Sequence, residues 1–222
     1  MTDIPTTPFT LHPRWPSLQA LLQAHQAAGM RLDLGCGYYK PQGYIGLDNL
    51  VGEAAQIINQ DNAPDILMDL SAQPLPFADN SVDEVRSSHF LEHSNLDHVL
   101  NESWRVLKPG GRLVFTVPYA NSAEGMYPGH HIFLTERWFH ENLNFQAKFH
   151  IERERYDPSQ AWRRLPLVVR GLIPFSFART FLFNACWQMQ IVARKRHTEA
   201  QPRPVRFAGI KSRLRPWLQR WR

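Results

Sequence analysis

The segment from Arg31 to Asp48, RLDLGCGYYKPQGYIGLD, constrains this chain more than any other. It combines a short apolar strand carrying Asp33, the turn GCG at 35–37, and a second strand that ends on Asp48. Glycines at the carboxyl end of a strand let backbone N–H groups approach a ligand, and an acid closing the next strand can accept hydrogen bonds from both ribose hydroxyls. The segment therefore predicts an adenosine-type pocket at the edge of a parallel sheet, although a simple strand–turn–strand has the same pattern.

Apolar strands and amphipathic helices alternate from residue 16 to residue 117. Strands are expected over 30–34, 44–47, 65–68, 82–88 and 112–117, and helices over 16–28 and 95–107. Thr135 is expected to cap a further helix through Leu143, and residues 145–156 to supply one or two closing strands. This alternation predicts an α/β fold with a mainly parallel sheet and helices on both faces.

The charge of the chain is unevenly distributed. Residues 1–156 carry a net charge of −7, whereas residues 157–222 carry +12. Such asymmetry often marks contact with an anionic surface. We therefore expect three parts, namely a loose N-terminal segment over 1–16, a domain over 17–156, and a basic, aromatic-rich helical extension over 157–222.

Three motifs in this order resemble the class I S-adenosylmethionine-dependent methyltransferases, in particular the methyltransferase type 11 group of small-molecule and glycan enzymes. They are LDLGCG followed by GLD, MDL before LPFADNSVDEV, and LEH followed by ESWRVLKPGGRLVFTVP. The resemblance covers residues 17–156. It implies a Rossmann-like fold, S-adenosylmethionine as cofactor, and methyl transfer as the activity.

The same resemblance implies a set of cofactor-binding residues. Asp33 would sit near the amino group of the cofactor, and Asp48 would hold the ribose hydroxyls. The remaining residues would pass under the methionyl part, bind the adenine, or line the methionine side and the acceptor; these are Gly35, Cys36, Gly37, Asp69, Leu70, Ser88 and His89. The sequence departs from the family at Tyr39, where a third glycine is usual, and in the short segment before Asp48, so the first crossover helix is expected to be reduced to a loop.

Two other classes of protein share part of this pattern. A nicotinamide dehydrogenase would need GxGxxG followed by a helix, and Lys40 stands where its last glycine would fall. A methyltransferase-like scaffold without activity would tolerate Tyr39 and the short loop, whereas the intact Asp48, Asp69 and Leu70 favour cofactor binding. Mass analysis for co-purified cofactor would distinguish a protein that binds S-adenosylmethionine from a scaffold that does not.

Methyl transfer from a sulfonium depends mostly on position, and an oxygen acceptor also needs a base. His93 and His130 are the candidate catalytic residues, with His89 and His131 also considered. His93 follows Leu91-Glu92 at the expected ligand edge, although a structural histidine packed on the next helix gives the same pattern. His130 lies in a glycine-containing loop after the fifth strand, which is also compatible with an ordinary surface loop. No further ligands show metal-site spacing near the adjacent pair His130 and His131, so no metal is expected.

The basic extension combines aliphatic and aromatic residues with arginine. Residues 162–195 are expected to cap the core or to lie on a membrane, and residues 210–222 place apolar residues on one helical face, interrupted by Pro216. A solvated basic tail is the alternative, and nucleic acid ranks below a membrane as partner. The acceptor is therefore expected to be a small molecule, a glycan or a lipid-linked compound. Two distant cysteines, with no signal peptide or long apolar run, favour a cytoplasmic protein, peripheral at the inner membrane face.

Overall fold

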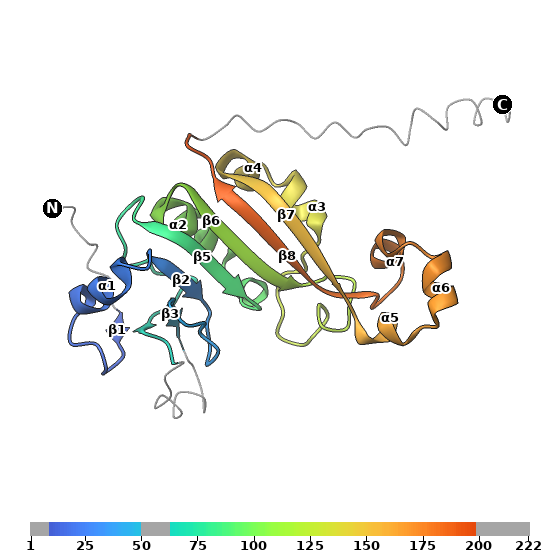
Figure 1. Ribbon diagram of the computed structural model, residues 1–222, viewed down its shortest axis with the longest axis horizontal. Coiled ribbons are helices and arrows are strands. Elements are labelled where there is room, and N and C mark those ends of the chain that lie inside the picture. Colours follow the sequence, from blue (N-terminus) through green and yellow to red (C-terminus); the bar gives the residue numbers. More distant parts are fainter. Residues whose placement is uncertain (1–8, 50–62, 199–222) are drawn as a thin grey trace.

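Within residues 9–49 and 63–198, which the computed structural model describes, eight strands form one sheet in the order β1-β4-β3-β2-β5-β6-β8-β7 (Figure 1). Its five central strands are parallel, which confirms the predicted mainly parallel sheet. They are β4 (Ile66–Leu67), β3 (Ile45–Asp48), β2 (Arg31–Leu34), β5 (Val82–Ser88) and β6 (Leu107–Pro118). Their carboxyl ends share one edge of the sheet, where a ligand of an α/β protein binds.

The two ends of the sheet are antiparallel. Strand β8 (Cys186–Lys195) lies between β6 and β7 (Phe149–Pro158) and runs against both. The sheet therefore continues well past the predicted domain boundary at residue 156, which does not separate two structural units. The alternating pattern could not reveal this, because a helical insertion over residues 159–185 separates β7 from β8 in the chain.

The expected looseness of residues 1–16 is wrong for the described residues from Phe9 onward. Strand β1 (Thr10–Leu11) pairs with β4. The backbone N–H of His12 then donates to the carbonyl of Asp65 at 2.9 Å, which ties this segment to the sheet.

Eight short helical segments connect or flank the strands in the part of the chain that the structure describes. They are α1 (Leu18–Gln26), the 3-10 turn η2 (Leu91–His93), α2 (Leu96–Val106), α3 (Glu136–Glu141), α4 (Leu143–Lys148), α5 (Gln160–Arg164), α6 (Leu167–Leu172) and α7 (Phe175–Phe181). None of the helices described there is long and apolar enough to cross a bilayer. Helices α5, α6 and α7 gather at one end of the molecule, beyond the ends of β7 and β8 (Figure 1).

The local signals for helix ends were partly correct. Asn95 caps α2 by accepting from the N–H of His98, at the predicted start of the helix over 95–107. Strand β6 begins at Leu107, directly after α2, so the KPGG motif lies within the strand rather than before it. The predicted helix from Thr135 to Leu143 ends early, at Glu141, and Asn142 caps a second helix, α4. The strand expected from residue 145 therefore begins only at Phe149.

The first crossover contains turns and no helix between Gly37 and Tyr44, as the sequence predicts. Lys40 leaves this loop and donates to the Oδ2 atom of Asp65 at 2.7 Å. A Cβ atom on Gly46 would stand 2.7 Å from the Cδ atom of Lys40, so the glycine makes room for the lysine stem. The ammonium of Lys40 is therefore bonded to Asp65, which disfavours the contact with phosphate that a dinucleotide would require.

Asp65 is the buried anchor of this half of the sheet. Its side chain is fully buried and accepts from Arg14, Trp15, Lys40 and the backbone N–H of Gly46. Burial raises the pKa of Asp65, but the hydrogen bonds from Lys40, Trp15 and Gly46 outweigh burial and hold the pKa below its usual value.

We predict that Asp65→Ala lowers the free energy of unfolding by about 3–5 kcal/mol, because it leaves two cations near the core without their partner. Urea denaturation measures this change. The control is Asp79→Ala, which removes an ion pair with Arg105 whose aspartate side chain is 68% exposed, so it should cost less than about 1 kcal/mol. Equal losses in the two variants would contradict the role assigned to Asp65.

Candidate active site

The turn after β2 is held against the end of β3. The backbone N–H groups of Gly35 and Cys36 donate to the carbonyl of Leu47 at 2.9 and 3.3 Å. The N–H of Gly37 donates to the Oδ2 atom of Asp48 at 2.7 Å. The glycine turn and the carboxylate that the sequence singled out are therefore in direct contact.

The two glycines of the turn have different tasks. A Cβ atom on Gly35 would lie 2.3 Å from the ring of Phe90, so Gly35 is required for packing. Gly37 has a φ of +51° and no heavy atom within 4 Å of the position of an added Cβ. The space beside Gly37 is therefore open to a ligand.

Cys36 contributes little chemistry of its own. Its thiol is buried, and burial raises the pKa of this group far above the usual value, so the sulfur stays protonated. Its backbone N–H is already bonded to Leu47. Cys36 therefore shapes the turn, whereas the space open to a ligand lies beside Gly37.

Asp33 lies on β2 next to the turn, with 2% of its surface exposed. Its Oδ2 atom accepts from Arg86 on β5 at 2.8 Å, but its buried Oδ1 atom has no hydrogen-bond partner among the described residues. Burial raises the pKa of Asp33 to about 6 and outweighs the lowering by Arg86. A buried carboxylate with one open oxygen is suited to a cationic or hydrogen-bond-donating ligand group.

The ends of β3 and β4 lie side by side at the same edge. The N–H of Met68 donates to the carbonyl of Asp48 at 3.1 Å, which brings the following residues, Asp69 and Leu70, next to the end of β3. Asp69 is exposed and accepts from the N–H of Ser71 at 2.9 Å, and Leu70 is buried. The two carboxylates that follow these strands are therefore carried by adjacent backbone segments at the same edge of the sheet.

Ser88 and His89 end β5 at the next position along the edge. Ser88 pairs with Thr116 on β6, and His89 has a φ of +54°, which is strained for a residue with a side chain. The His89 ring stacks on Trp187 at 5.7 Å, and its Nε2 atom bonds to the Oε1 atom of Gln188 at 2.9 Å. The strained backbone turns this histidine toward the antiparallel end of the sheet.

The predicted catalytic histidines meet across two loops. The rings of His93 and His130 are 4.7 Å apart in a T-shaped arrangement. Glu92, which sequence reasoning did not assign a role, lies beside them with 1% of its surface exposed. Its two carboxylate oxygens have no hydrogen-bond partner among the described residues, although the Nδ1 atom of His89 is 3.6 Å from Oε1. Burial raises the pKa of Glu92, against the opposing effects of its own backbone N–H and of the neighbouring histidines.

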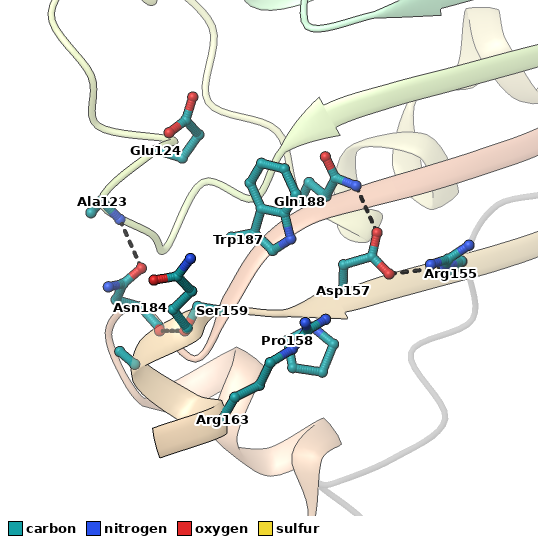
Figure 2. A pocket seen from close by; sticks show the side chains of 12 residues that line it. Ala123, Glu124, Arg155, Asp157, Pro158, Ser159, Arg163, Asn184, Trp187 and Gln188 are labelled. Atoms are coloured by element: carbon teal, nitrogen blue, oxygen red, sulfur yellow. Dashed lines mark hydrogen bonds and ion pairs between the residues drawn. The ribbon is translucent and has the colours of Figure 1, made fainter. Parts of the chain in front are cut away.

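A cavity of about 610 Å³ opens where β7 and β8 meet the helical insertion. Figure 2 shows Trp187 and Gln188 of β8 facing this space, with Glu124 on the loop opposite and Arg163 rising from α5. Its lining also includes Ala123, Arg155, Asp157, Pro158, Ser159, Gln160, Ala161 and Asn184. Most of these residues belong to the part of the chain expected to be a separate extension, so no motif identified them.

The cavity is connected to His89 by hydrogen bonds. Gln188 donates to Asp157 at 2.6 Å, and Asp157 accepts from Arg155 at 2.9 Å (Figure 2). The same Gln188 side chain bonds to His89, which faces Glu92. A line of polar groups therefore runs from the cavity to the carboxyl ends of the parallel strands.

Solved structures with this fold are methyltransferases and related enzymes. An S-adenosylmethionine-dependent methyltransferase from Archaeoglobus fulgidus is 17% identical, with a TM-score of 0.54 over 80% of this chain and 93% of that one. The [4+2]-cyclase SpnF is 22% identical, with a TM-score of 0.51 over 80% and 82% of the two chains. Geranyl diphosphate C-methyltransferase from Streptomyces coelicolor is 15% identical, with a TM-score of 0.50 over 79% and 81%. These similarities establish the fold, which is the predicted Rossmann-like fold of the class I methyltransferases.

A family model matches part of the chain. Residues 32–115 match the model described as a methyltransferase domain. A curated relative from Streptomyces fradiae, "Uncharacterized 37.1 kDa protein in transposon TN4556", is 34% identical over 113 residues, or 44% of this chain. The chain spans about a third of the length of that relative, since the match covers 32% of it.

S-adenosylmethionine is the cofactor of this class, and the observed residues fit its functional groups. The open Oδ1 atom of buried Asp33 suits the ammonium of the methionyl part. The open space at Gly37 leaves the backbone accessible, and the Asp48 carboxylate at the end of β3 suits a ribose. The absence of a helix after Gly37 is compatible with this cofactor, because it has no phosphate to bind.

We predict that Asp33→Asn changes the pH dependence of stability. The folded-state pKa of about 6 lies above the ordinary 3.8, so the folded protein keeps this proton where the unfolded chain releases it. The contribution of Asp33 to wild-type stability therefore falls as the pH rises between these values, by up to about 3 kcal/mol, and Asn removes that contribution. Urea denaturation from about pH 4 to 7, with exposed Asp97→Asn as control, measures it. A stability difference that is constant with pH would refute the assignment.

Proposed function

We propose that this protein transfers the methyl group of S-adenosylmethionine to a small-molecule, glycan or lipid-linked acceptor. The observation that carries the proposal is the convergence of Asp33, Gly37 and Asp48 at one edge of the sheet, beside the end of β4. The methyltransferase domain match over residues 32–115 supports it. The identity of the methylated atom is left open by these observations.

The chain's own residues would orient the cofactor. Asp33 would accept from the amino group, Asp48 from the ribose hydroxyls, and Asp69 from the adenine amino group, with Leu70 donating its N–H to the ring. Ser88 and His89 would border the methionyl end. When bound, the cofactor supplies an activated methyl group on sulfur, so the protein's task is to align an acceptor with it.

The acceptor would enter from the cavity beside Trp187. Arg155, Arg163 and Gln188 provide donors there, and Trp187 offers an apolar face on which a sugar or a hydrocarbon can pack. His93 and His130 would meet the reacting end of the acceptor, since they follow β5 and β6 at the same edge. In this proposal they are the catalytic candidates, and His89 connects them to the cavity.

A scaffold without methyl transfer remains the alternative function. SpnF, which has the same fold, is titled a cyclase, so the fold alone does not specify the reaction. A nucleic-acid acceptor depends on the basic residues beyond 198, which lie outside the described residues. Production of S-adenosylhomocysteine with candidate glycan and lipid-linked acceptors separates these possibilities.

We predict that Asp48→Ala weakens S-adenosylmethionine binding at least tenfold, because two hydrogen bonds from the ribose to a carboxylate are lost. Isothermal titration calorimetry measures the affinity. Asp97→Ala, which removes an exposed acid on α2, should bind like the wild type. Unchanged affinity in Asp48→Ala would rule out the proposed ribose site.

The helical insertion carries the features expected of a surface that contacts anionic lipid. Large apolar side chains of α6, α7 and the segment after them are exposed, namely Leu167, Val168, Leu172, Phe177, Phe181 and Phe183, at 50–77%. Arg163 and Arg164 are exposed beside them, and residues 159–185 include no Asp or Glu. This combination supports a peripheral location at the cytoplasmic membrane face, where a lipid-linked acceptor would be found. Residues 199–222, also expected to contribute, lie outside the described residues.

We predict that Leu172→Glu combined with Phe181→Glu reduces flotation with vesicles containing phosphatidylglycerol at least fivefold, since the change removes buried apolar area and adds like charge. Leu143→Glu, at a 54% exposed apolar position on α4, is the matched control and should float like the wild type. Equal flotation of all three proteins would remove the insertion from membrane contact.

A further inference from the structure

We propose that Glu92, His93 and His130 form a binding site for a divalent transition-metal ion such as zinc. One ligand atom from each residue lies within 4.8 Å of the others. Two imidazoles and one carboxylate are a ligand set that zinc accepts, with a further position left open. The site lies beyond the ends of β5 and β6, next to His89.

The hydrogen bonds of the two histidines leave one ring nitrogen of each available as a ligand. The Nδ1 atom of His93 is 3.0 Å from the carbonyl of Gly129, and that of His130 is 3.3 Å from the carbonyl of Gly125. A carbonyl only accepts, so each Nδ1 carries the proton and each Nε2 keeps a lone pair. Histidines that bind metals characteristically donate their other N–H to a carbonyl or carboxylate in this way.

Glu92 supplies the independent sign that a ligand is missing. Its carboxylate is almost completely buried, and neither oxygen has a hydrogen-bond partner among the described residues. A buried carboxylate without partners is costly, whereas coordination to a cation satisfies it. His89, at 3.6 Å from Oε1, lies beyond hydrogen-bond distance in this arrangement.

The backbone holds the two halves of the site together. The N–H groups of His131 and Ile132 donate to the carbonyl of Glu92 at 2.8 and 3.3 Å. This double contact fixes the loop carrying His130 against the 3-10 turn that carries Glu92 and His93. Ligand atoms 2.0–2.2 Å from a tetrahedral ion lie about 3.4 Å apart. Side-chain rotations that shorten the separations of up to 4.8 Å by about 1.4 Å would therefore close the site.

Sequence spacing could not indicate this site. His93 and His130 are far apart in the chain, and Glu92 immediately precedes His93 rather than standing at a ligand interval. The expectation that the chain binds no metal therefore rested on local spacing alone. With the ion bound, His93 and His130 would be ligands rather than bases. Any role of the ion in presenting an acceptor to the methyl group rests on the proposed function, whereas binding of the ion does not.

The test is titration of the full chain with zinc chloride after treatment with EDTA and dialysis, without S-adenosylmethionine. We expect one equivalent to bind the wild type, and Glu92→Gln and His130→Asn to weaken binding at least tenfold. His150→Gln, which removes an exposed histidine from β7, should bind like the wild type. Zinc should also raise the Tm of the wild type and of His150→Gln, but not that of Glu92→Gln.

Glu92→Gln keeps the shape of the side chain and removes a buried charge, so we expect this variant to fold. It therefore still tests the site if His130→Asn fails to fold. Absence of saturable zinc binding below about 1 mM, or equal binding by the wild type and Glu92→Gln, would overturn the proposal. Because cofactor is omitted, failure here leaves the S-adenosylmethionine site untouched. Loss of cofactor binding would in turn leave the zinc result standing.

Discussion

The site depends on two hydrogen bonds to the carbonyl of Leu47. This carbonyl accepts from the N–H groups of both Gly35 and Cys36, and so holds the turn after β2 against the end of β3. This contact requires β2 and β3 to be parallel and in register, with Leu34 opposite Leu47. The register in turn places Gly37 against the Asp48 carboxylate and Asp33 one residue into the buried strand. The placement of the proposed nucleoside site therefore follows from strand pairing rather than from any single residue.

Buried charge maintains that register from the opposite side. Asp65 precedes β4 and binds the N–H of Gly46 in β3, the loop residue Lys40 and the N-terminal Arg14. One carboxylate thus connects the N-terminal segment, the shortened crossover and the two adjacent strands. This explains how the protein retains an ordered turn without the usual crossover helix, since tertiary contacts replace the missing helical hydrogen bonds.

The parallel half of the sheet was predictable from sequence because its signals are local. A glycine turn, an acid at a strand end and a capped helix each depend on a few neighbouring residues, and they identified β2, β3, β5 and α2 within a few residues. The antiparallel half was not predictable in this way. Strand β8 pairs with β6 and β7 across a helical insertion, and the charge of residues 157–222 suggested a separate extension.

The residues around the proposed acceptor site were even less predictable from local sequence signals. Trp187 and Gln188 reach His89 only through the pairing of β8 with β6, and Glu92 meets His130 only through a loop that folds back on it. Such contacts leave no periodicity or spacing in the chain. The buried carboxylate of Glu92 could be recognised only once its surroundings were known, whereas Asp48 was recognisable from the strand that it ends.

The structure of the protein bound to S-adenosylhomocysteine tests the account most directly. We expect both ribose hydroxyls within about 3 Å of the Asp48 carboxylate, the amino group beside the Oδ1 atom of Asp33, and the adenine between Asp48 and Leu70. A nucleoside bound away from the turn at Gly37, or with its ribose turned away from Asp48, would contradict the account.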